Sequence, residues 1–166
     1  NDSPQGYLAD AGAEIVVPFG RASPKRYRKN TGEFVRAVPS ASGTLAVVAD
    51  GETLSGPGAT GAIETADART GAKIVSFPGR QLAVTPTRTY LVNGLELVAL
   101  DRVRWRGKRD AAEQAVLWKT ECSGGAALMV AGPMIYCGTS TGVEVFDAET
   151  GKPRQTLELG GGAIAL

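Results

Sequence analysis

The chain contains the stretch Ile63-Glu64-Thr65-Ala66-Asp67-Ala68-Arg69-Thr70-Gly71. A similar stretch follows 80 residues later as Val143-Glu144-Val145-Phe146-Asp147-Ala148-Glu149-Thr150-Gly151. A degenerate third copy ends at Thr31-Gly32. The glycines of the three Thr-Gly pairs stand at positions 32, 71 and 151, so the second interval is about twice the first. We therefore expect one further copy between positions 71 and 151.

Part of this further copy is visible in the sequence. Leu97-Val98-Ala99-Leu100-Asp101 supplies its strand, whereas the stretch Arg102–Ala115 replaces its Thr-Gly turn. A repeat of about 40 residues with several strands in each unit is typical of propeller blades. One four-stranded sheet cannot bury both of its faces alone, so neighbouring blades must stack on it. The sequence predicts an all-β fold made of antiparallel four-stranded blades, in a partial or open β-propeller.

Short apolar or alternating segments between turn residues support the all-β prediction. The chain has 22 glycines and 9 prolines, and Asn93-Gly94 is its strongest hairpin signal. The one helical turn that the sequence suggests, Arg109–Ala115 with Asp110 as its cap, is too short to be stable without tertiary support. The segments expected as strands are Glu14–Pro18, Thr44–Ala49, Gln81–Thr85, Thr89–Val92, Glu96–Leu100, Ala126–Ala131, Met134–Cys137 and Gly142–Phe146.

The repeat and the strand segments together predict where the blades lie. Residues 1–166 form a single propeller segment, with blades at about 14–37, 44–77, 81–119 and 126–158, and residues 159–166 begin a further blade. Closed propellers have about four to eight blades, so this number is near the lower limit. We expect the remainder of a longer chain to complete the propeller. Closure by a partner chain or by a dimer of half-rings is the alternative.

The composition excludes several functions. Lys and Arg number 18 against 17 Asp and Glu, and this balance gives no reason to expect nucleic acid as a partner. The absence of histidine excludes Ser-His-Asp and Cys-His catalysis, and two cysteines cannot by themselves complete a Cys-rich zinc site. No apolar run reaches the roughly 18 residues of a transmembrane helix. We therefore predict no catalytic residue, no metal ligand, no cofactor and no transmembrane segment.

The repeat resembles the pyrroloquinoline-quinone-type (PQQ-like, quinoprotein-like) β-propeller repeat family, whose blades end in Ala-x-Asp-x-x-Thr-Gly-Lys-x-x-Trp. Residues 145–152 match this pattern up to Gln155, which stands where the family has tryptophan, and residues 65–71 match it up to Ala72. The third unit keeps Ala99-x-Asp101 and, after its insertion, Leu117-Trp118-Lys119, which is similar to the family's Leu-Trp ending. The stretch Val17–Arg21, followed by Pro24, is similar to the blade entry of bacterial secreted members.

The resemblance implies a fold and a location more than an activity. Quinone-dependent dehydrogenases of this family hold their cofactor on a calcium ion, under a vicinal disulfide and stacking aromatic rings, whereas this chain has no adjacent cysteines. We expect a non-catalytic scaffold or binding domain of a larger periplasmic or extracellular protein, which presents loops to a protein or carbohydrate partner. One alternative is part of a PQQ-dependent dehydrogenase-like or other propeller enzyme whose active site lies mostly outside this segment. A sensor or substrate-recognition domain attached to a membrane or catalytic module is another.

The insertion of the third blade is the preferred binding candidate, with Arg102, Arg104, Trp105 and Arg106 as its residues. In an extended segment the three arginines point to one side, and Val103 and Trp105 point to the other. Guanidinium groups beside an indole suit a phosphate or a glycan. The structural alternative is a solvated loop that Trp105 anchors.

A second basic stretch comprises Arg21, Lys25, Arg26, Arg28 and Lys29. It is interpreted as an exposed blade face or turn, and an anion-binding patch is the alternative.

We expect the residues of the repeated turns to have a structural role. An aspartate at the end of a strand can accept backbone N–H bonds across the following turn, and glycine can take a left-handed conformation there. Recurrence at equivalent positions favours this role over catalysis, also for Asp101. The residues concerned are Asp67, Thr70, Gly71, Asp147, Thr150 and Gly151.

The two cysteines, Cys122 and Cys137, are expected as separate thiols. A hairpin at Ala131-Gly132-Pro133 pairs Cys137 with a residue near Ala127 and leaves Cys122 about five residues beyond. A bridge requires Cα atoms within about 7 Å. A disulfide, which would favour an oxidising compartment, is the alternative.

Overall fold

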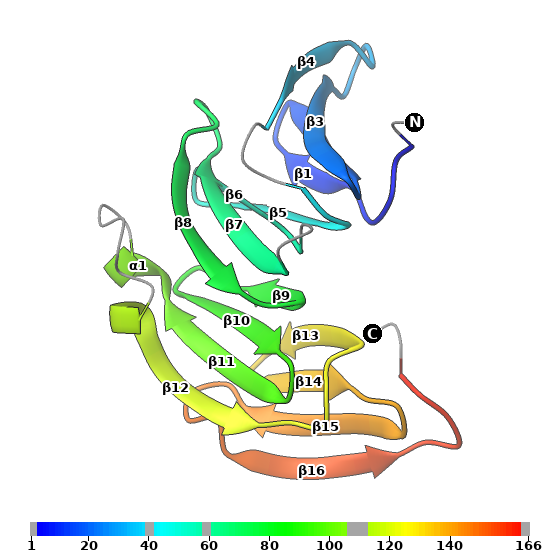
Figure 1. Ribbon diagram of the computed structural model, residues 1–166, viewed down its shortest axis with the longest axis vertical. Coiled ribbons are helices and arrows are strands. Elements are labelled where there is room, and N and C mark those ends of the chain that lie inside the picture. Colours follow the sequence, from blue (N-terminus) through cyan, green and yellow to red (C-terminus); the bar gives the residue numbers. More distant parts are fainter. Residues whose placement is uncertain (1–2, 39–41, 58–60, 106–112, 164–166) are drawn as a thin grey trace. The chain divides into compact units, whose positions relative to one another are not determined.

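The computed structural model describes residues 3–38, 42–57, 61–105 and 113–163, with the backbone alone for Trp105. These residues form four antiparallel sheets of four strands each (Figure 1), and the strands of every sheet follow one another in chain order. The longest helix among the described residues has four residues. The predicted all-β architecture of antiparallel four-stranded sheets is confirmed.

The first two sheets occupy the N-terminal half of the chain. One consists of β1 (Ala9–Ala11), β2 (Glu14–Phe19), β3 (Ala22–Arg28) and β4 (Phe34–Ala37), and the other of β5 (Leu45–Ala49), β6 (Glu52–Gly56), β7 (Ala62–Asp67) and β8 (Lys73–Pro78). The sequence placed the start of the first blade at Glu14, and the structure adds strand β1 before it.

The other two sheets follow in the C-terminal half. One consists of β9 (Gln81–Val84), β10 (Arg88–Asn93), β11 (Glu96–Asp101) and β12 (Val116–Glu121), and the other of β13 (Ala127–Ala131), β14 (Met134–Gly138), β15 (Gly142–Asp147) and β16 (Pro153–Glu158). Helix α1 (Arg102–Trp105) and a 3-10 turn (Glu113–Ala115) lie between β11 and β12 in the chain. Of the helical turn expected at Arg109–Ala115, only residues 113–115 lie in the described part of the chain, and they form this 3-10 turn.

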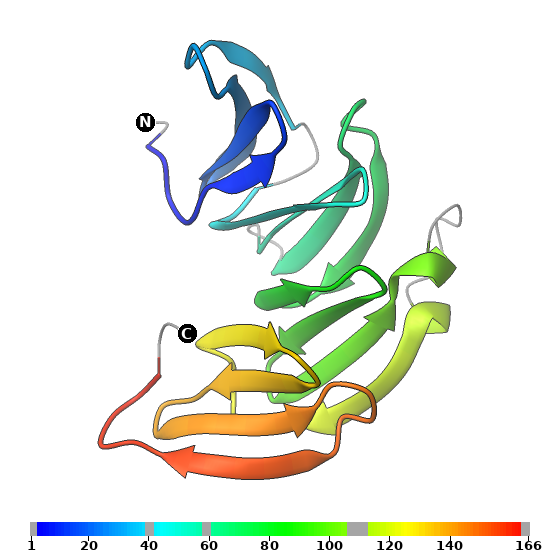
Figure 2. The same cartoon turned by 180° about the vertical axis from the view of Figure 1, so that it is seen from behind.

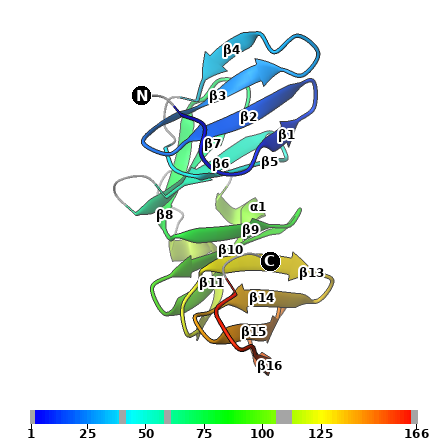
Figure 3. The same cartoon turned by 90° about the vertical axis from the view of Figure 1, so that its right-hand side faces the viewer.

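The chain divides into two compact units, the first comprising the described residues up to Pro78 and the second those from Gly79 onward. In the first unit the two sheets meet through their first strands, β1 and β5, which lie side by side (Figure 3). The buried Arg26 donates from Nη1 to Glu14 Oε2 at 3.0 Å and from Nη2 to Thr53 Oγ1 at 3.3 Å, so it links β2 and β3 to β6 of the neighbouring sheet.

In the second unit the sheet β9–β12 stacks on the sheet β13–β16 (Figures 1 and 2). Alternating apolar residues of both sheets face one another, because successive side chains of a strand point to opposite faces. They form one core cluster: Tyr90, Val92, Leu97, Ala99, Cys122, Ile135, Cys137, Phe146 and Ala148. The Tyr90 hydroxyl donates to the Ala148 carbonyl oxygen at 3.1 Å, which satisfies a polar group inside this core.

The three Thr-Gly pairs occupy equivalent turns. Gly32, Gly71 and Gly151 have φ angles of 70°, 76° and 71°, in the left-handed region that favours glycine. Each of their N–H groups donates to the carbonyl oxygen four residues earlier, at 2.8–2.9 Å. The predicted equivalence of these turns is therefore confirmed.

None of the helices formed by the described residues combines the length and the apolar character needed to cross a lipid bilayer.

Candidate functional site

Asp101 begins the segment that replaces the Thr-Gly turn of the third sheet. Its Oδ1 accepts hydrogen bonds from the N–H groups of Val103 at 2.8 Å and Arg104 at 3.2 Å. Asp67 and Asp147 accept the same two bonds, from the residues two and three positions later. The third sheet thus keeps the capping aspartate of the repeat, but the chain continues from it into helix α1.

The sequence predicted that the arginines of the insertion lie along one side of an extended segment. This prediction is wrong for the described part of the insertion. Residues 102–105 are helical, because Asp101 caps the first turn, and helical residues do not alternate between two sides. Arg102 is 0% exposed, with its backbone N–H bonded to the Thr87 oxygen at 2.9 Å and its Nη1 3.4 Å from the Thr85 oxygen. Arg102 therefore joins α1 to the loop before β10 and does not share a surface with Arg104.

Arg104 and Val103 lie on the outside of α1. The Arg104 side chain is 60% exposed and forms an ion pair with Asp101, with 3.3 Å between Nε and Oδ2. Val103 is 64% exposed. Arg106 and the side chain of Trp105, the other two predicted binding residues, lie outside the described part of the structure.

The basic stretch near the N-terminus is engaged in contacts of its own unit. Lys29 Nζ lies 2.7 Å from Asp10 Oδ2, Arg28 pairs with Glu33 at 3.4 Å, and Lys25 lies over the Phe19 ring. Arg26 is buried in its contacts with Glu14 and Thr53. These pairings support the structural interpretation of the stretch, although Arg26 is buried and not solvated as expected.

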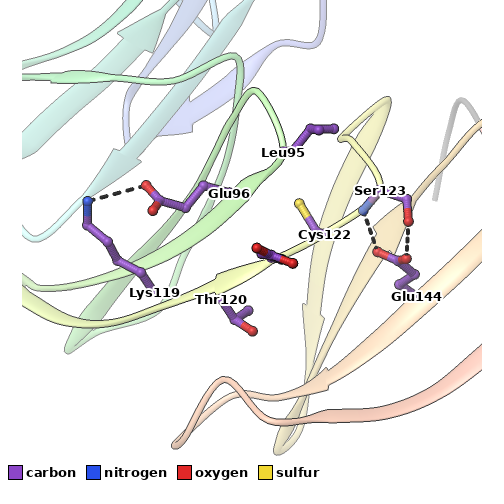
Figure 4. Close-up of a pocket in the computed structure, with 8 residues that line it drawn as sticks. Leu95, Glu96, Lys119, Thr120, Cys122, Ser123 and Glu144 are labelled. Carbon is purple, nitrogen blue, oxygen red and sulfur yellow. Dashed lines mark hydrogen bonds and ion pairs between the residues drawn. The ribbon is translucent and has the colours of Figure 1, made fainter.

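A hollow of about 870 Å³ lies in the second unit, where β11 and β12 meet the segment that follows β12 (Figure 4). Lys119 Nζ lies 3.3 Å from Glu96 Oε2 on one side of it. On the other side, the Glu144 carboxylate accepts from the Ser123 N–H at 2.9 Å and also from the Ser123 hydroxyl. The lining residues are Leu95, Glu96, Lys119, Thr120, Glu121, Cys122, Ser123 and Glu144.

The two cysteines meet beside this hollow. Both are free thiols, as predicted, and both belong to the core cluster of the second unit. The assumption that Cys122 lies well beyond Cys137 is wrong, because the chain turns between residues 122 and 126: Gly124 has a φ of 115°, and the Ala126 N–H bonds to the Gly138 oxygen. The Cys137 thiol donates to the Gly124 oxygen, with 2.9 Å between sulfur and oxygen.

The two neighbouring thiols differ in acidity. The Cys137 thiol lowers the pKa of Cys122 below its usual range, although burial and the carboxylates of Glu144 and Glu96 oppose this effect. The same contact and burial raise the pKa of Cys137. The sequence contained a signal for this arrangement, namely Gly124-Gly125 directly after Cys122-Ser123, but it does not give the direction of the turn.

Among the described residues, no group of three or more acidic, cysteine or histidine side chains is placed to hold a metal ion. No protein-family model matches the chain, and no curated protein matches it in sequence. Four antiparallel four-stranded sheets that follow one another in chain order are the blades of a β-propeller fold.

Two bacterial proteins are among the solved structures that this chain resembles. BamB from Moraxella catarrhalis aligns with a TM-score of 0.69 and 16% identity, over 95% of this chain and 54% of BamB. AztD from Citrobacter koseri aligns with a TM-score of 0.64 and 16% identity, over 96% of this chain and 48% of AztD. The chain thus spans about half the length of the propellers that it resembles.

Proposed function

We propose that the chain is a non-catalytic scaffold of the PQQ-like repeat type, part of a larger periplasmic or extracellular bacterial protein, and that it binds a protein partner through α1. The binding surface comprises Val103 and Arg104, with Trp105 and Arg106 following in the sequence. Arg102, which is buried, is left out of it.

One observation carries this proposal. In the second and fourth sheets the capping aspartate leads into a closed turn, whereas Asp101 leads into a helical turn that exposes a valine beside an arginine. The cap holds the first turn in place, so little conformational entropy is lost when a partner binds there. Exposed apolar area beside a guanidinium group is typical of the contact residues of protein interfaces. Loops on a rigid scaffold also carry function more often than the scaffold itself.

The test is site-specific photo-crosslinking in the full-length protein in its native cells. A benzophenone amino acid replaces Val103 in one variant and Arg69 in the other. Arg69 is the matched control, because it is also exposed and its N–H bonds to the capping aspartate of the second sheet, as that of Val103 does in the third. We expect one adduct of defined mass from position 103 and none from position 69. Equal adducts at both positions, or none at either, would refute the proposed surface.

Two further assays separate this proposal from its alternatives. The first tests whether the purified protein binds to an array of glycans. Binding that Arg104→Ala abolishes would indicate that the partner is a carbohydrate and not a protein. Dye reduction after reconstitution with pyrroloquinoline quinone and Ca²⁺ would favour the dehydrogenase-like alternative, and we expect none.

A further inference from the structure

The two thiols of the second unit differ in their access to solvent. Cys122 lines the hollow and is 5% exposed, whereas Cys137 is 0% exposed and lies behind it on β14. A reagent that enters the hollow therefore reaches the sulfur of Cys122 first. Thiol–disulfide exchange uses such an asymmetry, with a more accessible attacking thiol and a resolving thiol behind it.

The backbone around Cys122 is held from two sides. The Cys122 N–H donates to the Leu95 oxygen at 2.9 Å, and the next residue, Ser123, is bound by the Glu144 carboxylate of β15. The hydrogen bond from the Cys137 sulfur to the Gly124 oxygen ties β14 to the same segment. These contacts keep the two sulfurs together without a covalent bond between them.

The surroundings also activate one thiol more than the other. Once Cys122 is ionised, the single Cys137 proton can turn from the Gly124 oxygen to the Cys122 sulfur, which favours the Cys122 thiolate. The thiolate is the form that attacks a disulfide. Cys137 is the weaker acid of the two, because its thiol lies beside the Cys122 sulfur in a buried place. Attack by Cys122 followed by resolution by Cys137 is the order that both access and acidity favour.

We propose that Cys122 and Cys137 form a redox-active thiol pair, which closes to a disulfide by exchange with disulfide compounds that enter the hollow. The Cys122 thiolate attacks one sulfur of the compound RSSR, forms a mixed disulfide and releases RS⁻. Cys137 gives its proton to this RS⁻ and then attacks the Cys122 sulfur, which breaks the mixed bond and releases a second RS⁻. The second RS⁻ takes up the proton that Cys122 released to solvent when it ionised. The two thiols thus lose two electrons and two protons, and RSSR is reduced to two RSH. This modification site is independent of the proposed function of α1.

The test uses the reduced, purified protein and oxidised glutathione under native conditions. Intact mass and peptide mapping should show loss of two hydrogen atoms and a Cys122–Cys137 cross-linked peptide, with no lasting glutathione adduct. Cys137→Ser should retain one glutathione on Cys122, because nothing resolves the mixed disulfide. In Cys122→Ser, Cys137 should react more slowly than Cys122 does in the wild type, by about tenfold or more.

Three results would overturn the proposal. These are a lasting glutathione adduct on the wild-type protein without cross-linking, equal reactivity of both cysteines in the single variants, and reaction only after denaturation. Cys137→Ala serves as the second trapping variant if serine is not tolerated in this apolar core, with folding checked by circular dichroism. The wild-type peptide map decides independently of either variant.

Discussion

The indole ring of Trp118 lies directly against the backbone of Gly151. A β-carbon added to Gly151 would stand 2.5 Å from Cε3 of Trp118, which is closer than real contacts allow. Trp118 belongs to β12 and Gly151 to the turn between β15 and β16, so the contact joins the two sheets of the second unit. Glycine at position 151 therefore meets two needs, the left-handed φ of its turn and the close approach of the ring.

Gly151→Ala should destabilise the second unit through both effects. An L-residue in the left-handed region costs about 1–2 kcal/mol, and overpacking against the ring adds ~1–3 kcal/mol. The measurement is the free energy of unfolding in urea, with tryptophan fluorescence as the signal that monitors unfolding.

Gly94→Ala is the matched control, since Gly94 has a φ of 63° and nothing within 4 Å of an added β-carbon. Gly94→Ala should therefore show only the loss of stability that the left-handed backbone conformation causes. A double-mutant cycle with Trp118→Leu completes the test, because removing the ring should relieve part of the loss at position 151. Equal losses at positions 94 and 151, with strict additivity, would contradict the packing explanation.

Tyr90→Phe should lower the free energy of unfolding by about 0.5–1.5 kcal/mol, the net value of one hydrogen bond. The change removes the buried hydroxyl that donates to the Ala148 oxygen, while the ring still fills the core. Arg88 Nη1 also donates to that oxygen at 3.0 Å, so the carbonyl keeps a partner and the loss stays moderate. The Tyr136→Phe control, on β14, should have a smaller effect. A larger loss at Tyr136 would refute the role given to the Tyr90 hydroxyl.

Asp147 should make the stability of the second unit depend on pH in the acidic range. Its hydrogen bonds from Arg154, 2.7 Å from Oδ2, and from Thr150 hold the pKa of the folded state below the ordinary value of 3.8. A lowered pKa means that this stabilisation is fully present above the unfolded value and is lost as the pH falls below it toward the folded value. Thermal unfolding between about pH 5 and 2 measures this loss.

Two variants assign the acid dependence to this turn. Asp147→Asn should be less stable than the wild type near neutral pH and should lose less on acidification, because no carboxylate remains to be protonated. Thr150→Val keeps the carboxylate but removes one donor, so its dependence should be intermediate. An Asp147→Asn curve parallel to that of the wild type would place the acid sensitivity elsewhere.

Alkylation of Cys122 by iodoacetamide should reach half its maximal rate at a pH below that of an ordinary cysteine thiol. The cause is the Cys137 thiol, against which Glu144 of β15 and Glu96 of β11 act in the opposite direction. Lys119 of β12 forms an ion pair with Glu96, and Glu121 lines the same hollow. Cys137→Ala should shift the midpoint upward. A midpoint that does not change in this variant would show that Cys137 does not stabilise the thiolate.

The turns were predictable from the sequence because their interactions are local. Within the turn, Asp147 and Gly151 form hydrogen bonds only with residues at most seven positions away, and the sequence displays those residues in order. Two of the strands that the sequence did not single out are short or exposed. Strand β1 has three residues, and β16 is exposed along its whole length, so neither carries an apolar alternation.

The candidate sites were less predictable, because they depend on how the chain changes direction. The sequence shows the arginines after Asp101 but not that the aspartate caps a helix there and separates Arg102 from Arg104. It shows two cysteines 15 positions apart but not that the turn at Gly124 returns Cys122 to β14. Contacts between distant segments follow from tertiary packing, which periodicity within one strand does not contain.

The aspartate cap at position 101 has a consequence for how this blade can change. The hydrogen bonds that its Oδ1 accepts reach no further than Arg104, three residues after the strand, so they do not constrain the residues that follow. The pairing of β11 with β12 is fixed separately, by the ladder from Glu96–Glu121 to Leu100–Val116. Segments of different length and composition can therefore be accommodated between α1 and β12 while the sheet keeps its register, which makes this corner of the blade a natural insertion point.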